Sequence, residues 1–332
     1  MRLSDIGEVG LIQRIASRLK FRHTRTVLGI GDDAGVIRVD GSKFLIVTTD
    51  MLVEGTHFIW GKIPPHDLGY KSLAVNLSDI AAMGGKPLHA LVALGLPSHL
   101  QVEDIDAFYE GIRELAWQYE VDVLGGDITA SPRGLVVSLT VLGEVDPAIL
   151  ITQSGAVEGD LVAVTGDLGG SAAGLALLLD NLPGLDPSVS RLALEKHLRP
   201  RPRVEIGQAL SATGRVHAMK DVSDGLAKEL NTMACASGKM IRVRACDIPV
   251  SPAAVAVAPL ISQNPLSMAL RGGEDYELVF TFDRKAWDFI RTACDGLGVP
   301  VHVIGEVMTG EGVFIEDSGV TTRLDPEGYA HF

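Results

Sequence analysis

Short apolar segments that end in Gly-Asp or Thr-Asp recur along the sequence and constrain its fold more than any other feature. They end at Asp50, Asp127 and Asp167, with a looser version at Asp221. Helical periodicity separates them, most clearly at residues 102–119, where apolar residues return every three or four positions. Helices that alternate with short strands predict an α/β fold, or an interleaved α+β fold.

The expected elements fill both halves of the chain. A length of 332 residues suits about two domains. A turn at Asp146-Pro147 and a loop at 155–160 predict a boundary between domains at 1–148 and 149–332. The periodicities predict helices at 7–19, 67–83, 102–119 and 226–237, and strands at 36–39, 44–49, 88–96, 121–124, 135–145, 161–165, 241–244, 276–282 and 299–305.

The charge balance limits the possible partners. The chain has 29 basic and 42 acidic residues, which gives a net charge of −13 at pH 7. A chain this acidic is not expected to bind nucleic acid or an anionic membrane surface. A phosphate ligand would need a divalent cation to offset the repulsion, so Mg²⁺ is the first candidate cofactor.

The N-terminal residues, the short apolar stretches and the cysteine spacing favour a cytoplasmic protein. The first residues carry acids where a signal peptide needs a basic start. The longest apolar stretch, near 175–179, falls short of the ~20 residues needed to cross a bilayer. Cys235, Cys246 and Cys294 have no CxxC spacing, so we expect neither a zinc cage nor a disulfide framework.

The recurring aspartates predict a metal site. Ligand sites in α/β proteins gather at the carboxyl ends of strands, so acids placed there would converge. Crowded carboxylates repel one another and need bound cations, and Asp oxygens with Thr or Ser hydroxyls suit Mg²⁺. The alternative is ordinary turn chemistry, since Gly-Asp pairs also cap helices and close turns.

Two glycine-rich stretches do not match known nucleotide loops. Residues 29–34 read G-x-G-x-x-A, but two acids fill the loop, and a strand rather than a helix is expected to follow. Residues 237–240 contain Ser-Gly-Lys but lack the upstream glycine and the hydroxyl after the lysine of a Walker A loop. An ATP site in this chain would therefore use another architecture.

Four other polar positions allow two interpretations each. Asp79 lies opposite the apolar face of the 67–83 helix, which by helical-wheel geometry is a solvated surface. The stretch 221–225, Asp-Val-Ser-Asp-Gly, either caps a helix or brings metal and phosphate to its N-terminus. The stretch 272–278 is either a charged turn or a carboxylate presented to a ligand, and His57 lies in a loop. No Ser-His-Asp or Cys-His group supports covalent catalysis.

Taken together and in this order, several segments resemble the thiamine-monophosphate kinase family, which belongs to the aminoimidazole ribonucleotide synthetase superfamily. They span almost the whole chain: GIGDDAGVI (29–37), TTDMLVEGTHF (48–58), LGYKSLAVNLSDIAAMGGKP (68–87), LGGDIT (124–129), VTGDLGGSAAGLALL (164–178), HLRPRPR (197–203), DVSDGL (221–226), GGEDYEL (272–278) and GYAHF (328–332).

The resemblance implies a PurM-like two-domain fold. The N-terminal domain would carry the metal and ATP site and form a β-barrel with a second copy in a homodimer, and the α/β C-terminal domain would supply the phosphate loop and substrate contacts. The implied reaction moves the γ-phosphate of ATP to thiamine monophosphate, without a covalent or obligatory general-base residue. Matching positions imply Mg²⁺ ligands at Asp33, Thr48, Thr49, Asp50, Asp79, Asp127, Asp221 and Asp224, ATP contacts at Gly126, Asp127 and Ser223, and thiamine contacts at His57, Glu274 and Tyr329.

One position departs from the family. A basic residue often precedes the Ser-Gly pair that follows the 135–145 strand and contacts nucleotide phosphate there, whereas this chain has Gln153. We keep Gln153 as a candidate ATP contact and expect a nearby Arg to supply the charge. Two alternatives remain open: another ATP-using member of the superfamily, and a non-enzymatic acidic protein that binds divalent cations.

Overall fold

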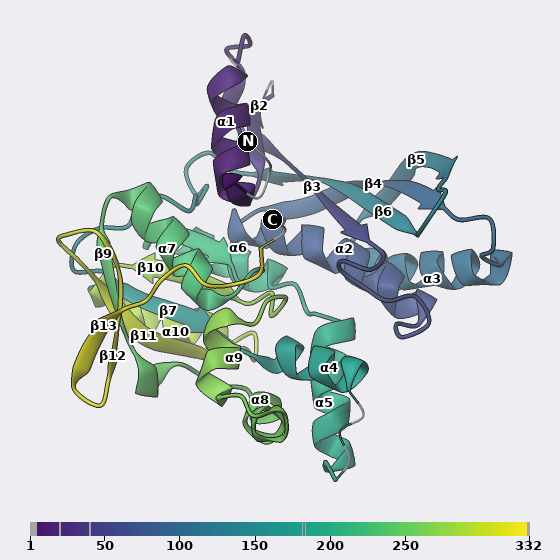
Figure 1. Ribbon diagram of the computed structural model, residues 1–332. Helices are drawn as coiled ribbons and strands as arrows, with labels where there is room; N and C mark the ends of the chain where they lie inside the picture. The colour runs from purple at the N-terminus through teal and green to yellow at the C-terminus, as the bar shows by residue number, and fades with distance from the viewer. Residues whose placement is uncertain (1–4, 20, 40, 181, 183, 331–332) are drawn as a thin grey trace.

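Two β-sheets, one from each half of the chain, frame the molecule in the computed structural model (Figure 1). The structure describes residues 5–19, 21–39, 41–180, 182 and 184–330. The first sheet contains β1 (Thr26–Leu28), β2 (Gly35–Arg38), β3 (Phe44–Val53), β4 (Lys86–Leu96), β5 (Asp122–Ala130) and β6 (Val136–Val145). Their order is β1-β2-β3-β6-β4-β5, so β5 forms one edge. Within this single chain the sheet is open.

The second sheet has seven strands in the order β13-β12-β9-β11-β7-β10-β8. They are β7 (Leu161–Thr165), β8 (Val216–Asp221), β9 (Met240–Arg244), β10 (Leu278–Phe282), β11 (Val301–Met308), β12 (Gly312–Asp317) and β13 (Val320–Arg323). The helices of this half are α4 (Gly170–Leu179), α5 (Pro187–Leu198), α6 (Val204–Ala212), α7 (Leu226–Ser237), α8 (Pro252–Val257), α9 (Pro265–Arg271) and α10 (Trp287–Asp295). Alternating helices and strands in both halves confirm the α/β (α+β) prediction.

Helix α2 (Pro65–Ala82) occupies the centre of the molecule. It lies on one face of the first sheet against β3 and β6, and it also contacts β8 and α6 of the second half. Helix α3 (Val102–Gln118) packs closely against α2. The approach is so close that a Cβ at Gly69 would lie only 1.8 Å from the Phe108 carbonyl oxygen, so only glycine fits there. Residues on every side of α2 are therefore buried, including Ser72 and Asn76. The helical wheel wrongly assigned this polar face, and Asp79 with it, to solvent.

Two of the predicted strands continue beyond their aspartates. Strand β3 pairs with β6 as far as Val53, so Asp50 lies within it rather than at its end. Strand β5 continues past Gly125-Gly126-Asp127 to Ala130, and the register shift against β4 falls at Leu124, between the paired residues Val123 and Gly125. Gly125, with φ of 143°, directly follows this irregularity inside the strand. The expectation that these acids converge at strand ends is wrong for Asp50 and Asp127.

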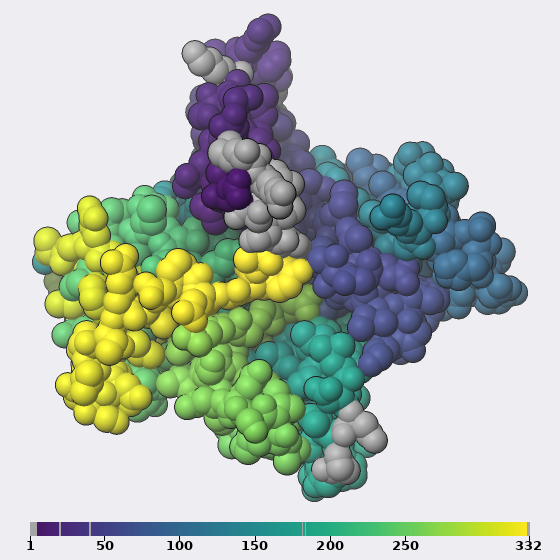
Figure 2. Space-filling model, in the orientation of Figure 1, coloured from purple at the N-terminus to yellow at the C-terminus, as the bar shows by residue number. Residues whose placement is uncertain are grey.

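The C-terminal segment joins the two halves. Figure 2 shows it in yellow, lying across the C-terminal half and reaching toward the N-terminal half. The Tyr329 amide donates to the Asp224 carbonyl (3.1 Å), and the Tyr329 ring lies 6.4 Å from the His57 ring. Residues 328 and 329 are thereby brought to the space between the sheets.

The described residues form no single helix that is both long enough and apolar enough to cross a bilayer. Within the same residues, one pair of consecutive helices, 252–261 and 265–271, is long and apolar enough when the two are taken together, but the pair is bent by 111°.

Candidate active site

Three aspartates from distant parts of the chain meet beside α2. Asp33 comes from the loop between β1 and β2, Asp79 from α2, and Asp221 from the end of β8. Each offers a carboxylate oxygen, and these oxygens lie within 4.8 Å of one another. We call Asp33, Asp79 and Asp221 the acid cluster. The packing of α2 between both sheets creates it.

The hydrogen bonds of the acid cluster leave room for a cation. The Thr48 hydroxyl donates to Asp79, and the Ser78 hydroxyl donates to Asp221 Oδ2 (2.7 Å). Asp33 Oδ2 and Asp221 Oδ1 are buried and have no hydrogen-bond partner among the residues that the structure describes. Unpartnered buried carboxylate oxygens are costly, and three hard oxygen ligands at this spacing fit a divalent cation such as Mg²⁺.

Asp50 and Asp224, two further predicted ligands, lie near the acid cluster, and the crowded carboxylates shift each other's pKa values. Burial, the Asp224 carboxylate and the Asp33 carboxylate raise the pKa of Asp50 to about 6. Burial, followed by Asp50, Asp221 and Asp33, raises the pKa of Asp79 well above its usual value. Carboxyls that hold protons this strongly repel one another when ionised, so a bound cation would stabilise their charged forms.

A lysine and a glutamate that the sequence interpretation did not include also face the acid cluster. The Lys220 ammonium forms an ion pair with Asp33 and lies 3.6 Å from Glu229. The Asp33 and Glu229 side chains are each only 2% exposed. Burial raises the pKa of Glu229 to about 7, although Lys220 opposes the shift.

A cleft of about 1230 Å³ runs from Asp50 to the C-terminal segment. Asp224 and Ser223 border it just before α7, and Glu274 and Tyr329 border it farther along. Thr49 also borders the cleft, but its hydroxyl donates to the Leu139 carbonyl within the sheet (2.9 Å). The cleft thus connects the metal-type ligands with the predicted substrate contacts.

Glu274 is held in the cleft by two buried side chains. Lys71 of α2, 2% exposed, places its ammonium 2.9 Å from Glu274 Oε1. His197 of α5 places Nδ1 3.3 Å from Glu274 Oε2 and 2.9 Å from the Ser171 hydroxyl. Burial alone would raise the pKa of Glu274, but Lys71, together with His197 and His57, outweighs burial and holds that pKa below its usual value. Burial and Lys71 lower the pKa of His197 to about 3, so its ring is neutral at pH 7.

Of the remaining predicted contacts, His57 borders the cleft, whereas Gln153 bonds to the loop at Gly31 and Asp32. His57 accepts a hydrogen bond from the Val53 amide at Nδ1 (3.0 Å) and borders the cleft near Tyr329. The backbone N–H of Gln153 donates to the Asp32 carboxylate (3.2 Å), and the side-chain Nε2 of Gln153 donates to the Gly31 carbonyl. Gln153 therefore closes the loop that carries Asp33, and a contact with nucleotide phosphate there remains a prediction.

Gly126 and Asp127 are not brought to the acid cluster. Asp127 on β5 pairs with Ala93 on β4, which pairs with Ser138 on β6, which in turn pairs with Met51 on β3. Asp127 is therefore three strand spacings from Met51 across the sheet, or about 14 Å. Met51 is 55% exposed on the open face of the sheet, whereas the neighbouring Asp50 points to the α2 face. At Gly126 a Cβ would lie 1.6 Å from the Val92 carbonyl oxygen, which explains the glycine without a ligand.

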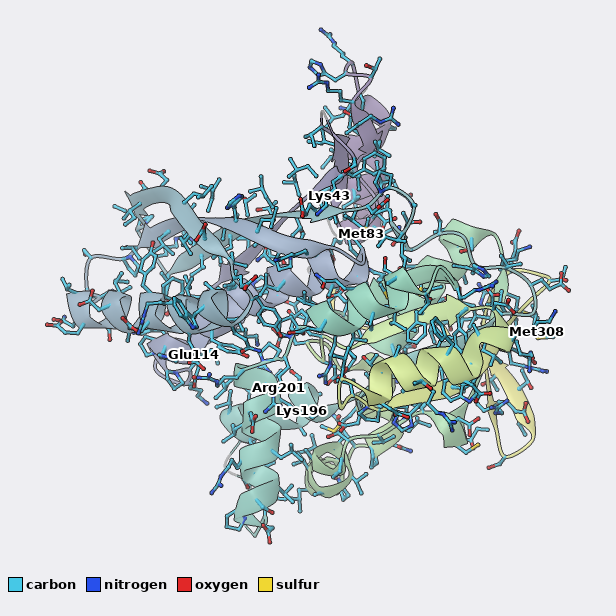
Figure 3. All side chains as sticks on the ribbon, turned by 180° about the vertical axis from the view of Figure 1, so that it is seen from behind. Lys43, Met83, Glu114, Lys196, Arg201 and Met308 are labelled. Atoms are coloured by element: carbon cyan, nitrogen blue, oxygen red, sulfur yellow. The ribbon has the colours of Figure 1, made fainter. Side chains whose placement is uncertain are left out.

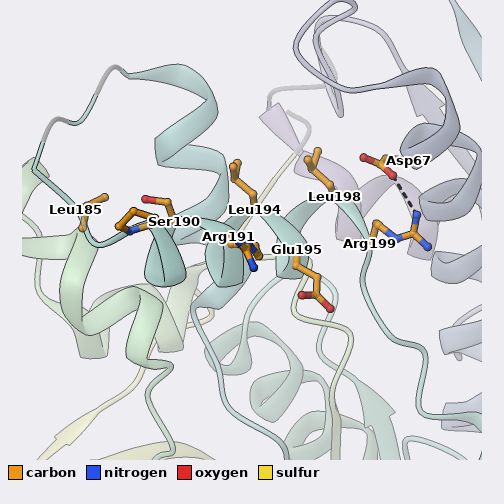
Figure 4. Close-up of a pocket in the computed structure, with 9 residues that line it drawn as sticks. Asp67, Leu185, Ser190, Arg191, Leu194, Glu195, Leu198 and Arg199 are labelled. Atoms are coloured by element: carbon orange, nitrogen blue, oxygen red, sulfur yellow. Dashed lines mark hydrogen bonds and ion pairs between the residues drawn. The ribbon is translucent and has the colours of Figure 1, made fainter.

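A second hollow of about 770 Å³ lies along α5 (Figure 4). Arg199 borders it and donates to Asp67 (3.2 Å), the pair drawn with a dashed line. The residues that border it include Leu185, Leu194 and Leu198, and none of them is a predicted site residue. We therefore place the candidate active site in the larger cleft.

Known proteins resemble this chain over almost its whole length. The AIR synthase related protein N-terminal domain family matches residues 31–145, and the corresponding C-terminal domain family matches residues 157–318. Thiamine-monophosphate kinase from Bacillus subtilis (strain 168) is 40% identical over 330 residues, which cover 98% of this chain and 100% of that protein.

The chain belongs to the thiamine-monophosphate kinase family. A solved structure described as "AaThiL complexed with AMPPCP and TMP" is 35% identical, with a TM-score of 0.88, and the match covers 100% of this chain and 99% of that chain. Thiamine monophosphate kinase from Aquifex aeolicus is 33% identical, with a TM-score of 0.82 and coverage of 98% and 100%. The two-domain fold expected from the family resemblance is therefore confirmed.

Proposed function

We propose that this chain transfers the γ-phosphate of ATP to thiamine monophosphate, yielding thiamine diphosphate. The observation that carries the proposal is the single cleft that joins Asp50 and Asp224 to Glu274 and Tyr329. Two anions can meet there beside a cation site, with a carboxylate at the far end for a cationic ring. The complex of a relative with AMPPCP, an ATP analogue, and TMP supports this assignment. We also propose domains at 1–148 and 149–332 and a cytoplasmic location, which fits three free cysteines.

The acid cluster, with Thr48, Asp50 and Asp224, would hold Mg²⁺. When bound, Mg²⁺ neutralises phosphate charge and orients the reacting groups. The protein's own contribution is to fix these ligands on rigid elements. Thr48 and Asp50 lie on β3, Asp79 on α2 and Asp221 at the end of β8, and Asp224 is held by Lys228 (2.5 Å).

The remaining residues bind and orient the two substrates. The acceptor phosphate is largely ionised at pH 7, so its oxygen needs no general base. Glu274, kept ionised by Lys71, would face the thiazolium cation, with His57 and Tyr329 beside it. Ser223 would contact ATP at the entrance to α7.

An assay of thiamine diphosphate formed from ATP and thiamine monophosphate tests the proposal. We expect product with Mg²⁺ and none after EDTA. Product with another acceptor only would favour a different superfamily member, and Mg²⁺ binding without any response to ATP would favour the non-enzymatic alternative. Radiolabel from the γ-phosphate on denatured protein would contradict direct transfer.

Substituting Glu274 with Gln should raise KM for thiamine monophosphate by about 10- to 100-fold, because a charge-assisted contact contributes about 1.5–3 kcal/mol. KM for ATP should change little. Glu274→Gln also leaves the Lys71 ammonium buried without a counter-charge, so some loss of stability is expected.

The matched control is Glu277→Gln. Glu277 is buried in an ion pair with Arg203 but does not border the cleft. This variant should lose stability without the increase in KM. Equal KM values for thiamine monophosphate in Glu274→Gln and the parent protein would exclude Glu274 as a substrate contact.

We propose that the chain acts as a homodimer in which Asp127 serves the partner's site. The open face and edge of the first sheet expose apolar side chains at Val123, Leu124 and Ile128. All nine residues of β5 are exposed, whereas every other strand of this sheet except the short β1 contains fully buried residues, so β5 presents an uncovered apolar surface. A second copy packed on this face would cover these residues and could bring Asp127 to a site that its own chain cannot reach.

A purified heterodimer of Asp127→Ala and Asp79→Asn subunits tests this arrangement. If Asp127 acts across the interface, one of the two sites keeps every ligand, so about half of the parent activity should return. The control pairs Asp79→Asn with Asp50→Ala, two changes near one acid cluster, and should stay inactive. An inactive Asp127→Ala/Asp79→Asn heterodimer would show that Asp127 does not act in the partner's site.

A further inference from the structure

Lys220 is a cation built into the acid cluster. It lies on β8, directly before Asp221, and its side chain is 14% exposed. Its ammonium forms an ion pair with Asp33 Oδ1 and lies 3.6 Å from Glu229 Oε2. Lys220 therefore contributes a fixed positive charge where several carboxylates converge.

The two oxygens of Asp33 have different surroundings. Oδ1 contacts the Lys220 ammonium, whereas Oδ2 is buried and finds no hydrogen-bond partner in the described part of the chain. The same holds for Asp221 Oδ1 within the described residues. A divalent ion can bind the unpartnered oxygens, but a second one on Asp33 Oδ1 would lie against the ammonium and be repelled.

We propose that the Lys220 ammonium takes the place of one divalent cation at Asp33. The parent chain then binds one ion fewer than a chain with an uncharged residue at position 220. Lys220 also offsets one unit of carboxylate charge when the divalent concentration is low. This inference rests on the metal site of the proposed function. Counting bound ions distinguishes a wrong role for Lys220 from a wrong assignment of the metal site.

The first test counts Mn²⁺ ions bound per chain, by electron paramagnetic resonance of free Mn²⁺ and by calorimetry, without nucleotide. Lys220→Met should bind one Mn²⁺ more than the parent, and Lys220→Arg should match the parent. The control is Lys43→Met, which changes net charge equally at a half-exposed lysine paired with Glu144 (Figure 3). It should leave the Mn²⁺ count unchanged.

The second test does not depend on the folding of a variant. An anomalous difference map from parent crystals with Mn²⁺ should show an ion on Asp33 Oδ2 and none on Oδ1. An Mn²⁺ ion bonded to Oδ1, or equal counts in Lys220→Met and the parent, would overturn the role of Lys220. No Mn²⁺ bound to the parent at all would overturn the metal site itself, and this inference with it.

Discussion

Asp79→Asn is expected to lower kcat by about 10²–10³-fold and, without metal, to make the folded protein more stable. The loss of activity follows from removing a central ligand of the acid cluster, since charge stabilisation of this kind contributes about 10²–10³-fold per group. The gain in stability follows from removing a carboxylate that burial and three neighbouring aspartates disfavour.

The free energy of unfolding without metal should therefore be higher in Asp79→Asn than in the parent protein, because the substitution removes a carboxyl whose pKa is raised well above its usual value. Asparagine keeps the shape of the side chain and can still accept the Thr48 hydrogen bond. Thermal or urea unfolding in EDTA measures the stability, and the coupled assay measures kcat.

Asp106→Asn is the matched control, because Asp106 is exposed on α3, away from the cleft. It should leave kcat unchanged and alter the free energy of unfolding by no more than about 0.5 kcal/mol. An Asp79→Asn variant with near-parent kcat would remove Asp79 from the metal site. A variant less stable than the parent would mean that Asp79 supports the fold.

The sequence predicted helices α2, α3 and α7, but it predicted neither the acid cluster nor helices α5, α6, α8, α9 and α10. The period of 102–119 fixed α3 to within a residue, and the Gly-Gly pair after α2 fixed its end. The convergence of Asp33, Asp79 and Asp221 depends on α2 packing between two sheets, and no local pattern encodes a contact across so many residues. The family resemblance supplied Asp79 where helical periodicity alone excluded it.

Residues missed by sequence reasoning share a different property. Lys71 and Lys220 look like ordinary helix and strand lysines, yet both are buried against carboxylates from distant segments. The sequence did offer one indication for Lys71: it follows Tyr70 on a helix that otherwise contains few charges. A lysine in such a helix is a candidate for a buried ion pair. Strands β12 and β13 were missed because short, exposed hairpin strands carry little apolar pattern.

The pH dependence of stability should change sign when Mg²⁺ is added. Burial and nearby acids raise the pKa of Asp50 to about 6, and burial raises that of Glu229 to about 7. Between pH 5 and 7 the folded state then holds more protons than the unfolded state. Because stability falls with pH wherever the folded state binds more protons, the metal-free protein should lose about 1–2 kcal/mol per pH unit in this window.

Mg²⁺ should oppose this trend, because it binds deprotonated carboxylates and competes with protons. At 100 times its dissociation constant each bound ion adds about 2.7 kcal/mol to the free energy of unfolding, and that affinity itself rises with pH. With saturating Mg²⁺ we therefore expect stability that is level or rises from pH 5 to 7, measured by urea unfolding at each pH.

Two variants test whether the effect comes from the carboxyls beside the acid cluster. Asp50→Asn should reduce the metal-free slope without abolishing it, because it removes one of the two carboxyls that take up a proton in this window, whereas the exposed Asp106→Asn should leave the slope unchanged. Metal-free stability that rises with pH would mean that the buried carboxylates are ionised without a cation. The electrostatic argument for the metal site would then fail, even if the family assignment stood.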